Sequence, residues 1–150
     1  MNPRQAAGLA ARLIVGAVLV YAGASKAAAP AEEFALVIQS YDVAPPAAAL
    51  PLAGLLPWAE LTVGWALLLG VETTAAAAAA GAMFGLFLAS LGSVVARGIA
   101  LPSCGCFGDA IHFTLVQALL FDSAMAALCW TAFRAGSGPI SLDAWSQRGA

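Results

Sequence analysis

The chain has 150 residues, of which 62% are hydrophobic and 9% are charged, and its formal net charge is −2. Soluble domains carry about 25% charged residues, and a small fold leaves much of its chain exposed to water, so this composition excludes an ordinary soluble domain. A nucleic-acid-binding protein would show a basic surplus, which this sequence lacks. We therefore expect one compact domain embedded in the lipid bilayer.

Four apolar segments are long enough to cross a membrane, which takes about 20 apolar residues in a helix. They run over residues 9–29, 50–71, 74–96 and 113–133. The pattern predicts an all-α fold, in which residues 1–135 form a four-transmembrane-helix bundle. Residues 136–150 have mixed polarity and are expected to form a short, loosely ordered cytoplasmic tail.

The first apolar segment also has features of a cleaved signal peptide. Arg4 and Arg12 precede its apolar core, and small residues such as Ala22 and Ala24 follow. Cleavage would leave three spans. A retained helix is favoured because the apolar run is long and three further spans follow it.

The connection between the first two spans has a helical pattern of its own. Pro30 suits the first turn of a helix, where Glu32 and Glu33 would interact favourably with the helix dipole. Apolar residues then recur on one helical face: Phe34, Val37, Ile38 and Tyr41. This stripe predicts a short helix lying at the membrane surface and ending at Pro45 and Pro46.

Basic residues are unevenly distributed between the two sides of the predicted bundle. The side of the termini carries Arg4, Arg12, Arg134 and Arg148, and the other side carries Lys26 and Arg97. Because cytoplasmic flanks are enriched in Lys and Arg, this bias predicts a multi-pass protein of the cell inner membrane with both termini in the cytoplasm. The connection between the third and fourth spans would then be periplasmic or extracellular, where disulfides persist.

That connection contains a close pair of cysteines, in the sequence Cys104-Gly105-Cys106-Phe107-Gly108. A disulfide requires its two Cα atoms to lie about 4.4–6.8 Å apart, and Gly105 would allow the backbone turn that this needs. Such a small ring would be strained, and strained, exposed disulfides are the labile ones. A permanent crosslink would be expected to close a longer loop. The spacing therefore predicts that Cys104 and Cys106 form an exchangeable redox pair.

Two other interpretations of the pair remain open. The cysteines could stay reduced in a tight turn, or they could bind a metal together with His112 and Asp109. The spacing matches no common zinc pattern, so redox chemistry is favoured and no metal site is predicted. Cys129 lies far along the fourth span and is interpreted as a packing residue.

Several charged residues fall in or beside the apolar segments. Glu60 and Asp122 lie inside spans, where a carboxylate is costly and usually faces a partner in the bundle interior. Lys26 and Glu60 belong to the same side and form the most plausible ion pair. Lys26 and Arg97 could favour a thiolate by their positive charge, with Glu60 orienting Lys26, or they could simply extend to the membrane interface.

The order of these motifs resembles the methylamine utilisation protein MauE family, within the DoxX-like group of four-helix membrane proteins. The resemblance covers about residues 8–133 and rests on four motifs in addition to the cysteine motif: Ala22-Gly23-Ala24-Ser25-Lys26, Ser40-Tyr41, Leu56-Pro57-Trp58-Ala59-Glu60-Leu61 with Gly64, and Arg97-Gly98. It implies a periplasmic thioredoxin-like partner and a role in the maturation of methylamine dehydrogenase. It also invites comparison with membrane thiol oxidoreductases that pass electrons to quinone. Those enzymes use two cysteine pairs, whereas this chain has one, so a partner would have to complete any electron relay.

Three functional hypotheses follow from the sequence. The first is a thiol–disulfide redox protein, and whether the chain is itself an oxidoreductase stays open. The second is a non-enzymatic membrane scaffold with a structural or metal-binding cysteine turn. The third is a small transporter or quinone-linked carrier, suggested by Glu60 and Asp122, since buried acids often mark proton paths.

Overall fold

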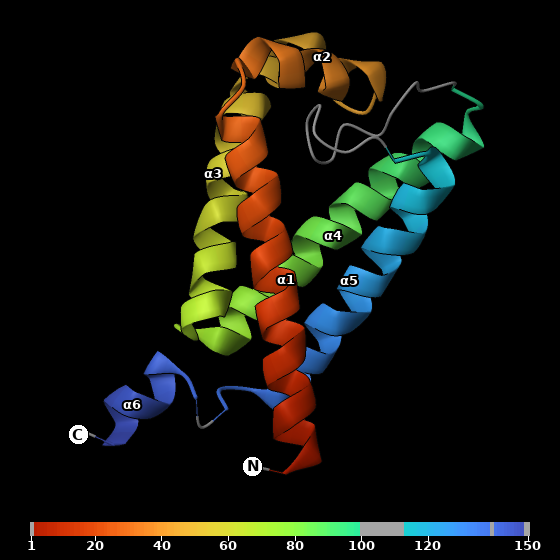
Figure 1. The fold of residues 1–150 in the computed structure, drawn as a ribbon. Helices are drawn as coiled ribbons and strands as arrows, with labels where there is room; N and C mark the ends of the chain where they lie inside the picture. Colours follow the sequence, from red (N-terminus) through yellow and green to blue (C-terminus); the bar gives the residue numbers. More distant parts are fainter. Residues whose placement is uncertain (1, 100–112, 139, 149–150) are drawn as a thin grey trace.

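The computed structural model describes residues 2–99, 113–138 and 140–148. In this part of the chain every regular element is a helix (Figure 1): α1 (Pro3–Ala27), α2 (Ala31–Ser40), α3 (Pro46–Leu69), α4 (Thr73–Ala96), α5 (Leu115–Ala135) and α6 (Leu142–Arg148). Helices α1, α3, α4 and α5 are long and apolar enough to cross a membrane. The predicted four-span bundle and the short helix between its first two spans are thus confirmed.

Local sequence signals explain where two of the spans begin. Asn2 and Gln5 form a capping box at the start of α1, and Thr114 and Gln117 form one at the start of α5. Each box gives two backbone N–H groups a side-chain partner before the helical hydrogen bonds begin. The third span starts earlier than expected, at Pro46, because proline fits the first turn of a helix.

The spans pack as two close pairs, α1 with α3 and α4 with α5, and α1 also packs along α5 (Figure 1). Glycines permit the contact between α1 and α3. A Cβ atom on Gly16 would lie 3.0 Å from the Gly64 carbonyl oxygen, and one on Gly64 would lie 2.9 Å from the Val20 backbone nitrogen. Small residues on facing sides allow membrane helices to approach this closely.

The main hydrophobic core lies where these four spans meet. Its fully or almost fully buried side chains include Val15, Leu19, Leu67, Ala80 and Phe84. Cys129 belongs to the same cluster and is 2% exposed, as expected for a packing residue.

The C-terminal tail is attached to the bundle rather than loosely ordered as predicted. The Asp143 carboxylate accepts hydrogen bonds from the backbone N–H groups of Glu72 and Thr73, at 2.8 and 2.9 Å, and from the Thr73 hydroxyl at 2.8 Å. It therefore caps the N-terminus of α4 from another part of the chain, which satisfies donors that a helix start leaves unpaired. Desolvation acts to raise the pKa of Asp143, but the hydrogen bonds from Thr73 and Glu72 and the charge of Arg12 outweigh it and lower this pKa.

Arg12 contributes to the same attachment. Its side chain is enclosed in the protein, since Arg12 is 3% exposed. Its Nη2 donates to the Ile140 carbonyl oxygen at 2.7 Å. We call this region, with Arg12, Asp143 and the α3–α4 turn, the terminal end of the bundle, and the opposite region, with α2, Lys26 and Arg97, the α2 end.

Candidate functional site

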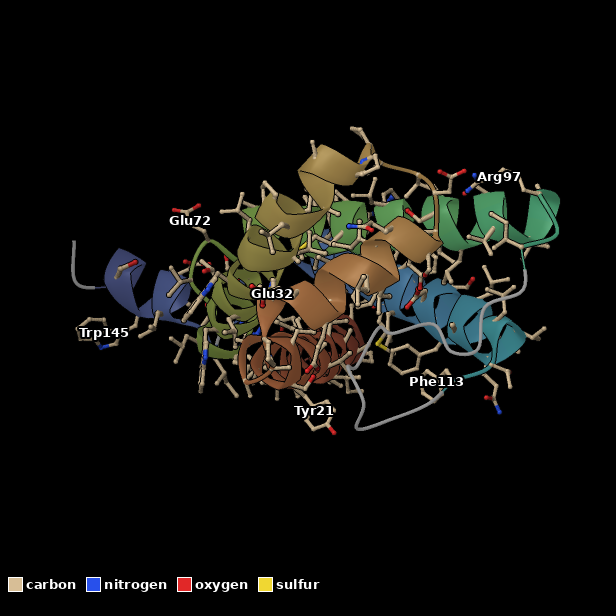
Figure 2. The ribbon with its side chains drawn as sticks, turned by 90° about the horizontal axis from the view of Figure 1, so that it is seen from above. Tyr21, Glu32, Glu72, Arg97, Phe113 and Trp145 are labelled. Atoms are coloured by element: carbon tan, nitrogen blue, oxygen red, sulfur yellow. The ribbon has the colours of Figure 1, made fainter. Side chains whose placement is uncertain are left out.

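The predicted redox pair, Cys104 and Cys106, lies outside the described residues, as do Asp109 and His112 of the metal alternative. The structure describes the chain on both sides of this segment. Helix α4 ends at Ala96, and α5 begins at Leu115. Figure 2, a view from above, shows Arg97 and Phe113 on one side of the molecule and Glu72 and Trp145 on the other. The cysteine segment is therefore joined to the bundle at the α2 end.

Lys26 and Glu60 form a buried ion pair between α1 and α3, as the sequence predicted. Lys26 Nζ lies 2.7 Å from both carboxylate oxygens of Glu60. The exposed fraction is 5% for Lys26 and 0% for Glu60. Since Gly64 and Pro57 are also buried on this face of α3, the pair is enclosed by the tight α1–α3 contact. Lys26 does not extend to the membrane interface, so that interpretation of it is wrong.

Two further groups surround the Lys26 ammonium. Nζ lies 3.4 Å from the Ala22 carbonyl oxygen and 5.5 Å from the centre of the Phe34 ring. The face of an aromatic ring attracts a cation. The hydrogen bond from the third ammonium proton to the Ala22 carbonyl oxygen is weak, because 3.4 Å exceeds the usual distance between nitrogen and oxygen in a hydrogen bond. The positive charge is thus balanced by Glu60 and supported by Phe34 of α2.

Arg97 has a different set of partners. Its Nη1 lies 3.1 Å from the Asp42 carboxylate and 2.9 Å from the Asp42 carbonyl oxygen, and its Nη2 donates to the Tyr41 carbonyl oxygen. Arg97 therefore ties the C-terminal end of α4 to the segment between α2 and α3. The Arg97 and Asp42 side chains are 37% and 82% exposed, so this pair is screened by solvent.

An apolar cluster joins the ends of α4 and α5 to the same segment. Leu91 and Ala118 are buried in it, and Tyr41, Phe113 and Leu119 pack against them. Tyr41 thus contributes its side chain to this cluster and its carbonyl to Arg97. Together these contacts fix where the cysteine-containing connection leaves and re-enters the bundle.

A cavity of about 270 Å³ lies at the α2 end, and no sequence pattern predicted it. Side chains of α2, α3 and α4 form most of its wall, and Lys26 of α1 adds a charged group. The cavity arises from tertiary packing, because its walls depend on how α2 lies relative to α3 and α4.

The remaining candidate residue, Asp122, lies in the fourth span. Asp122 is 2% exposed, so this carboxyl group is enclosed in the bundle as predicted. Within the described residues, no group of three His, Cys, Asp or Glu side chains could hold a metal ion. The described part of the chain therefore offers a buried ion pair, an exposed arginine and a cavity, but no ligand set for a metal.

Comparison with known proteins decides the family. A family model described as "Methylamine utilisation protein MauE" matches residues 4–135. This chain belongs to the MauE family. Among curated proteins, the methylamine utilization protein MauE of Methylophilus methylotrophus is 38% identical over 96 residues, which cover 64% of this chain and 50% of that protein.

The chain thus spans about half the length of this MauE relative. No solved structure matches it. The MauE match confirms the resemblance found from the motifs and, with four candidate spans, supports a multi-pass membrane protein. The matched range contains the four spans and the cysteine segment and ends before α6.

Proposed function

We propose that this MauE-family protein supports thiol–disulfide exchange during the maturation of a periplasmic partner in methylamine utilisation. In the family setting that partner is methylamine dehydrogenase, and a periplasmic thioredoxin-like protein would exchange disulfides with this chain. The family description and the name of the 38% identical relative support the methylamine context. The DoxX-like relationship is part of the same proposal.

The proposal depends chiefly on one observation. The glycine-spaced pair Cys104–Cys106 belongs to a connection whose described flanks lie at the α2 end, together with the Lys26–Glu60 pair. Leu91 and Tyr41 join these regions, since both line the cavity beside Lys26 and both belong to the cluster that contains Phe113. We therefore propose that exchange with the partner takes place at the α2 end.

The exchange itself would follow ordinary thiol chemistry. A thiolate of the partner attacks the Cys104–Cys106 disulfide and forms a mixed disulfide with one of the two cysteines. The partner's second thiolate then attacks the partner sulfur of this mixed disulfide, so the partner leaves with its own disulfide. This leaves Cys104 and Cys106 as two thiols. To regenerate their disulfide, two electrons and two protons pass to an oxidant, for which we propose a membrane quinone that leaves as quinol.

The geometry refines the roles proposed for the charged residues. Glu60 balances the Lys26 charge, so Lys26 contributes little positive potential that could stabilise a thiolate. Its proposed role is instead that of a hydrogen-bond donor whose position is set by Glu60. Arg97 remains partly exposed at the end of α4, where it can favour a thiolate electrostatically. Asp42 weakens this effect by partial neutralisation.

The proposed orientation places both termini in the cytoplasm and the cysteine segment in the periplasm of a cell with an inner membrane. Setting aside the two basic residues that are buried with partners, Arg12 and Lys26, sharpens the charge bias. The terminal end keeps Arg4, Arg134 and Arg148, whereas the α2 end keeps Arg97. The excess on the terminal side supports cytoplasmic termini.

A redox titration of the full-length protein tests the proposed exchange. With Cys129 changed to Ala, any change in the number of free thiols reports on Cys104 and Cys106 alone. We expect the pair to be oxidised and reduced within the range of physiological thiol buffers, and Cys104→Ser and Cys106→Ser to abolish the transition. A pair that stays reduced in every buffer would rule out the exchange.

Partner maturation separates the redox role from a scaffold role. We expect both serine variants to stop disulfide formation in the partner while the membrane protein remains at its normal level. If maturation continues in both variants, the protein acts as a non-enzymatic scaffold.

A further inference from the structure

The cavity at the α2 end has the character of a binding site for a small, mostly apolar molecule. Its volume of about 270 Å³ is near the lower limit of ordinary ligand pockets, about 300 Å³. Three aromatic side chains line it, Phe34 and Tyr41 on or beside α2 and Phe87 on α4. Aromatic walls favour a flat ring, which they can contact face to face or edge to face.

The cavity is bordered by side chains that face outward from the membrane spans. Leu52 of α3 and Leu86 of α4 line it and are 38% and 61% exposed. Figure 1 shows α4 leaning away from α3 toward the α2 end. Because α3 and α4 are membrane spans, their exposed apolar side chains lie in lipid. A ligand would therefore reach the cavity by lateral movement within the membrane.

The Lys26–Glu60 pair affects whether the cavity favours a charged or a neutral ligand. Lys26 lines the cavity, but Glu60 holds its ammonium through two hydrogen bonds of 2.7 Å. An anionic ligand would have to compete with this carboxylate, whereas a neutral ligand need not. The electrostatics of the site thus favour a neutral molecule over a phosphate or carboxylate headgroup.

One proton of the Lys26 ammonium is available for such a molecule. Its contact with the Ala22 carbonyl oxygen is long, at 3.4 Å, and that oxygen also accepts from the Ser25 hydroxyl at 3.0 Å. If this proton were donated to a ligand oxygen instead, the Ala22 carbonyl would still accept a hydrogen bond from the Ser25 hydroxyl. Across the cavity, the Ser90 hydroxyl donates to the Leu86 carbonyl at 2.9 Å, so its own oxygen can accept a hydrogen bond.

We propose that this cavity binds the ring of a membrane-dissolved quinone. A quinone is neutral, flat and lipid-soluble, its carbonyl oxygen can accept from Lys26, and the hydroxyl of the reduced form can donate to Ser90. The site is new, but its redox meaning rests on the proposed function, in which the quinone takes two electrons and two protons from Cys104 and Cys106. Binding itself does not depend on the cysteines.

Binding of decylubiquinone to the full-length protein in lipid nanodiscs tests the site, with two neighbouring substitutions compared. Leu56 lines the cavity, whereas Leu55 is 69% exposed on the outside of α3. We expect Leu56→Trp to weaken decylubiquinone binding by about tenfold or more by filling the cavity, and Leu55→Trp to leave it unchanged. Equal affinities for the two variants would overturn the proposal.

A second variant covers the case in which Leu56→Trp does not fold. Leu86→Trp adds bulk at an exposed edge of the cavity, where the core is not disturbed, and should also weaken binding. A saturated fatty alcohol with a tail of similar length serves as competitor. If it displaces decylubiquinone at equal concentration, the cavity holds an acyl chain and not a quinone ring, which would also overturn the proposal.

The double variant Cys104→Ser/Cys106→Ser separates this proposal from the proposed function. We expect it to bind decylubiquinone with wild-type affinity. If wild-type protein binds the quinone but its cysteines never oxidise, the proposed exchange fails and the site stands. If the cysteines cycle but no variant affects quinone binding, the site fails and the exchange stands.

Discussion

The two ends of the bundle use charged residues in opposite ways. At the α2 end, Lys26 and Glu60 are enclosed between two spans beside a cavity of about 270 Å³. At the terminal end, Asp143 is attached from outside as a helix cap, and the void beside Arg12 measures about 10 Å³. The α2 end thus contains a cavity beside a buried ion pair, whereas the terminal end is tightly packed and is held by hydrogen bonds to the C-terminal tail.

This difference indicates where the molecule can bind something. The terminal end is filled, and the Asp143 carboxylate satisfies N–H donors at the start of α4, which stabilises the fold, although the buried Arg12 Nε has no hydrogen-bond partner there among the described residues. A hollow end with a buried charge pair costs stability, since an ion pair in an apolar interior rarely repays its desolvation. Such a cost is expected where function requires it, which is why the proposed site lies at the α2 end.

The largest effect should come from breaking the buried pair on one side only. Lys26→Met leaves the Glu60 carboxylate enclosed without its partner, so we expect a loss of about 3–5 kcal/mol in the free energy of unfolding. Thermal unfolding of the purified protein in detergent measures this loss. The double variant Lys26→Met/Glu60→Met removes both charges and should be much closer to wild type. Equal losses in the single and double variants would show that the pair is not a unit.

The next effect concerns the α1–α3 contact that encloses the pair. A Cβ atom on Gly64 would lie 2.9 Å from the Val20 backbone nitrogen, whereas one on Gly85 would meet no atom within 4 Å. We expect Gly64→Ala to lower the free energy of unfolding by about 1–3 kcal/mol through overpacking. Gly85→Ala is the matched control and should raise it by up to about 1 kcal/mol through helix propensity. Similar results for both glycines would contradict a tight α1–α3 contact.

At the terminal end, Asp143→Asn should have a smaller, local effect. The variant keeps the shape of the side chain but loses charge and one acceptor, so we expect the tail attachment to weaken by about 1 kcal/mol, as for other helix caps. Faster hydrogen exchange at the Glu72 and Thr73 amides would report it. The spans themselves should unfold at the wild-type temperature, and a large drop in that temperature would mean that the tail stabilises the whole bundle.

The same attachment should depend on pH. Because the folded-state pKa of Asp143 is lowered, its contribution is complete above the unfolded-state value of about 3.9 and is lost as the pH falls through the folded-state pKa. We expect the amide NMR signals of Glu72 and Thr73 to shift in acid, below about pH 4. In Asp143→Asn these signals should not follow that titration, and an unchanged titration in the variant would assign it to another group.

At the α2 end, sequence patterns predicted the helices and the ion pair but did not predict how the helices pack around a cavity. The spans follow from apolar length, α2 follows from the stripe of Phe34 and its neighbours, and the Lys26–Glu60 pair follows from the cost of a lone charge in a membrane. The cavity could not be predicted, because no periodicity encodes how far α4 leans from α3. Cys104 and Cys106 lie outside the described residues, so their redox pairing stays a prediction.

The terminal end was missed for a different reason. Asp143 caps α4 across about 70 residues of sequence, and a contact at such a separation leaves no local pattern. One local signal was present. Ser141 accepts a hydrogen bond from the Ala144 N–H at 3.1 Å, and serine followed by an acidic residue is a common start of a helix. That signal could have identified α6, but not its place on the bundle.

The smallest effect should come from the exposed pair at the α2 end. Asp42→Asn removes the charge that faces Arg97, but Arg97 still donates to the carbonyl oxygens of Tyr41 and Asp42. Since the Asp42 side chain is 82% exposed, we expect a change of less than about 1 kcal/mol in unfolding free energy. The variant nevertheless frees the Arg97 charge, so alkylation of Cys104 and Cys106 should become faster if Arg97 favours their thiolates. Arg97→Gln should then slow alkylation, and identical rates in both variants would remove Arg97 from the redox site while leaving its role as a link between α4 and the α2–α3 segment.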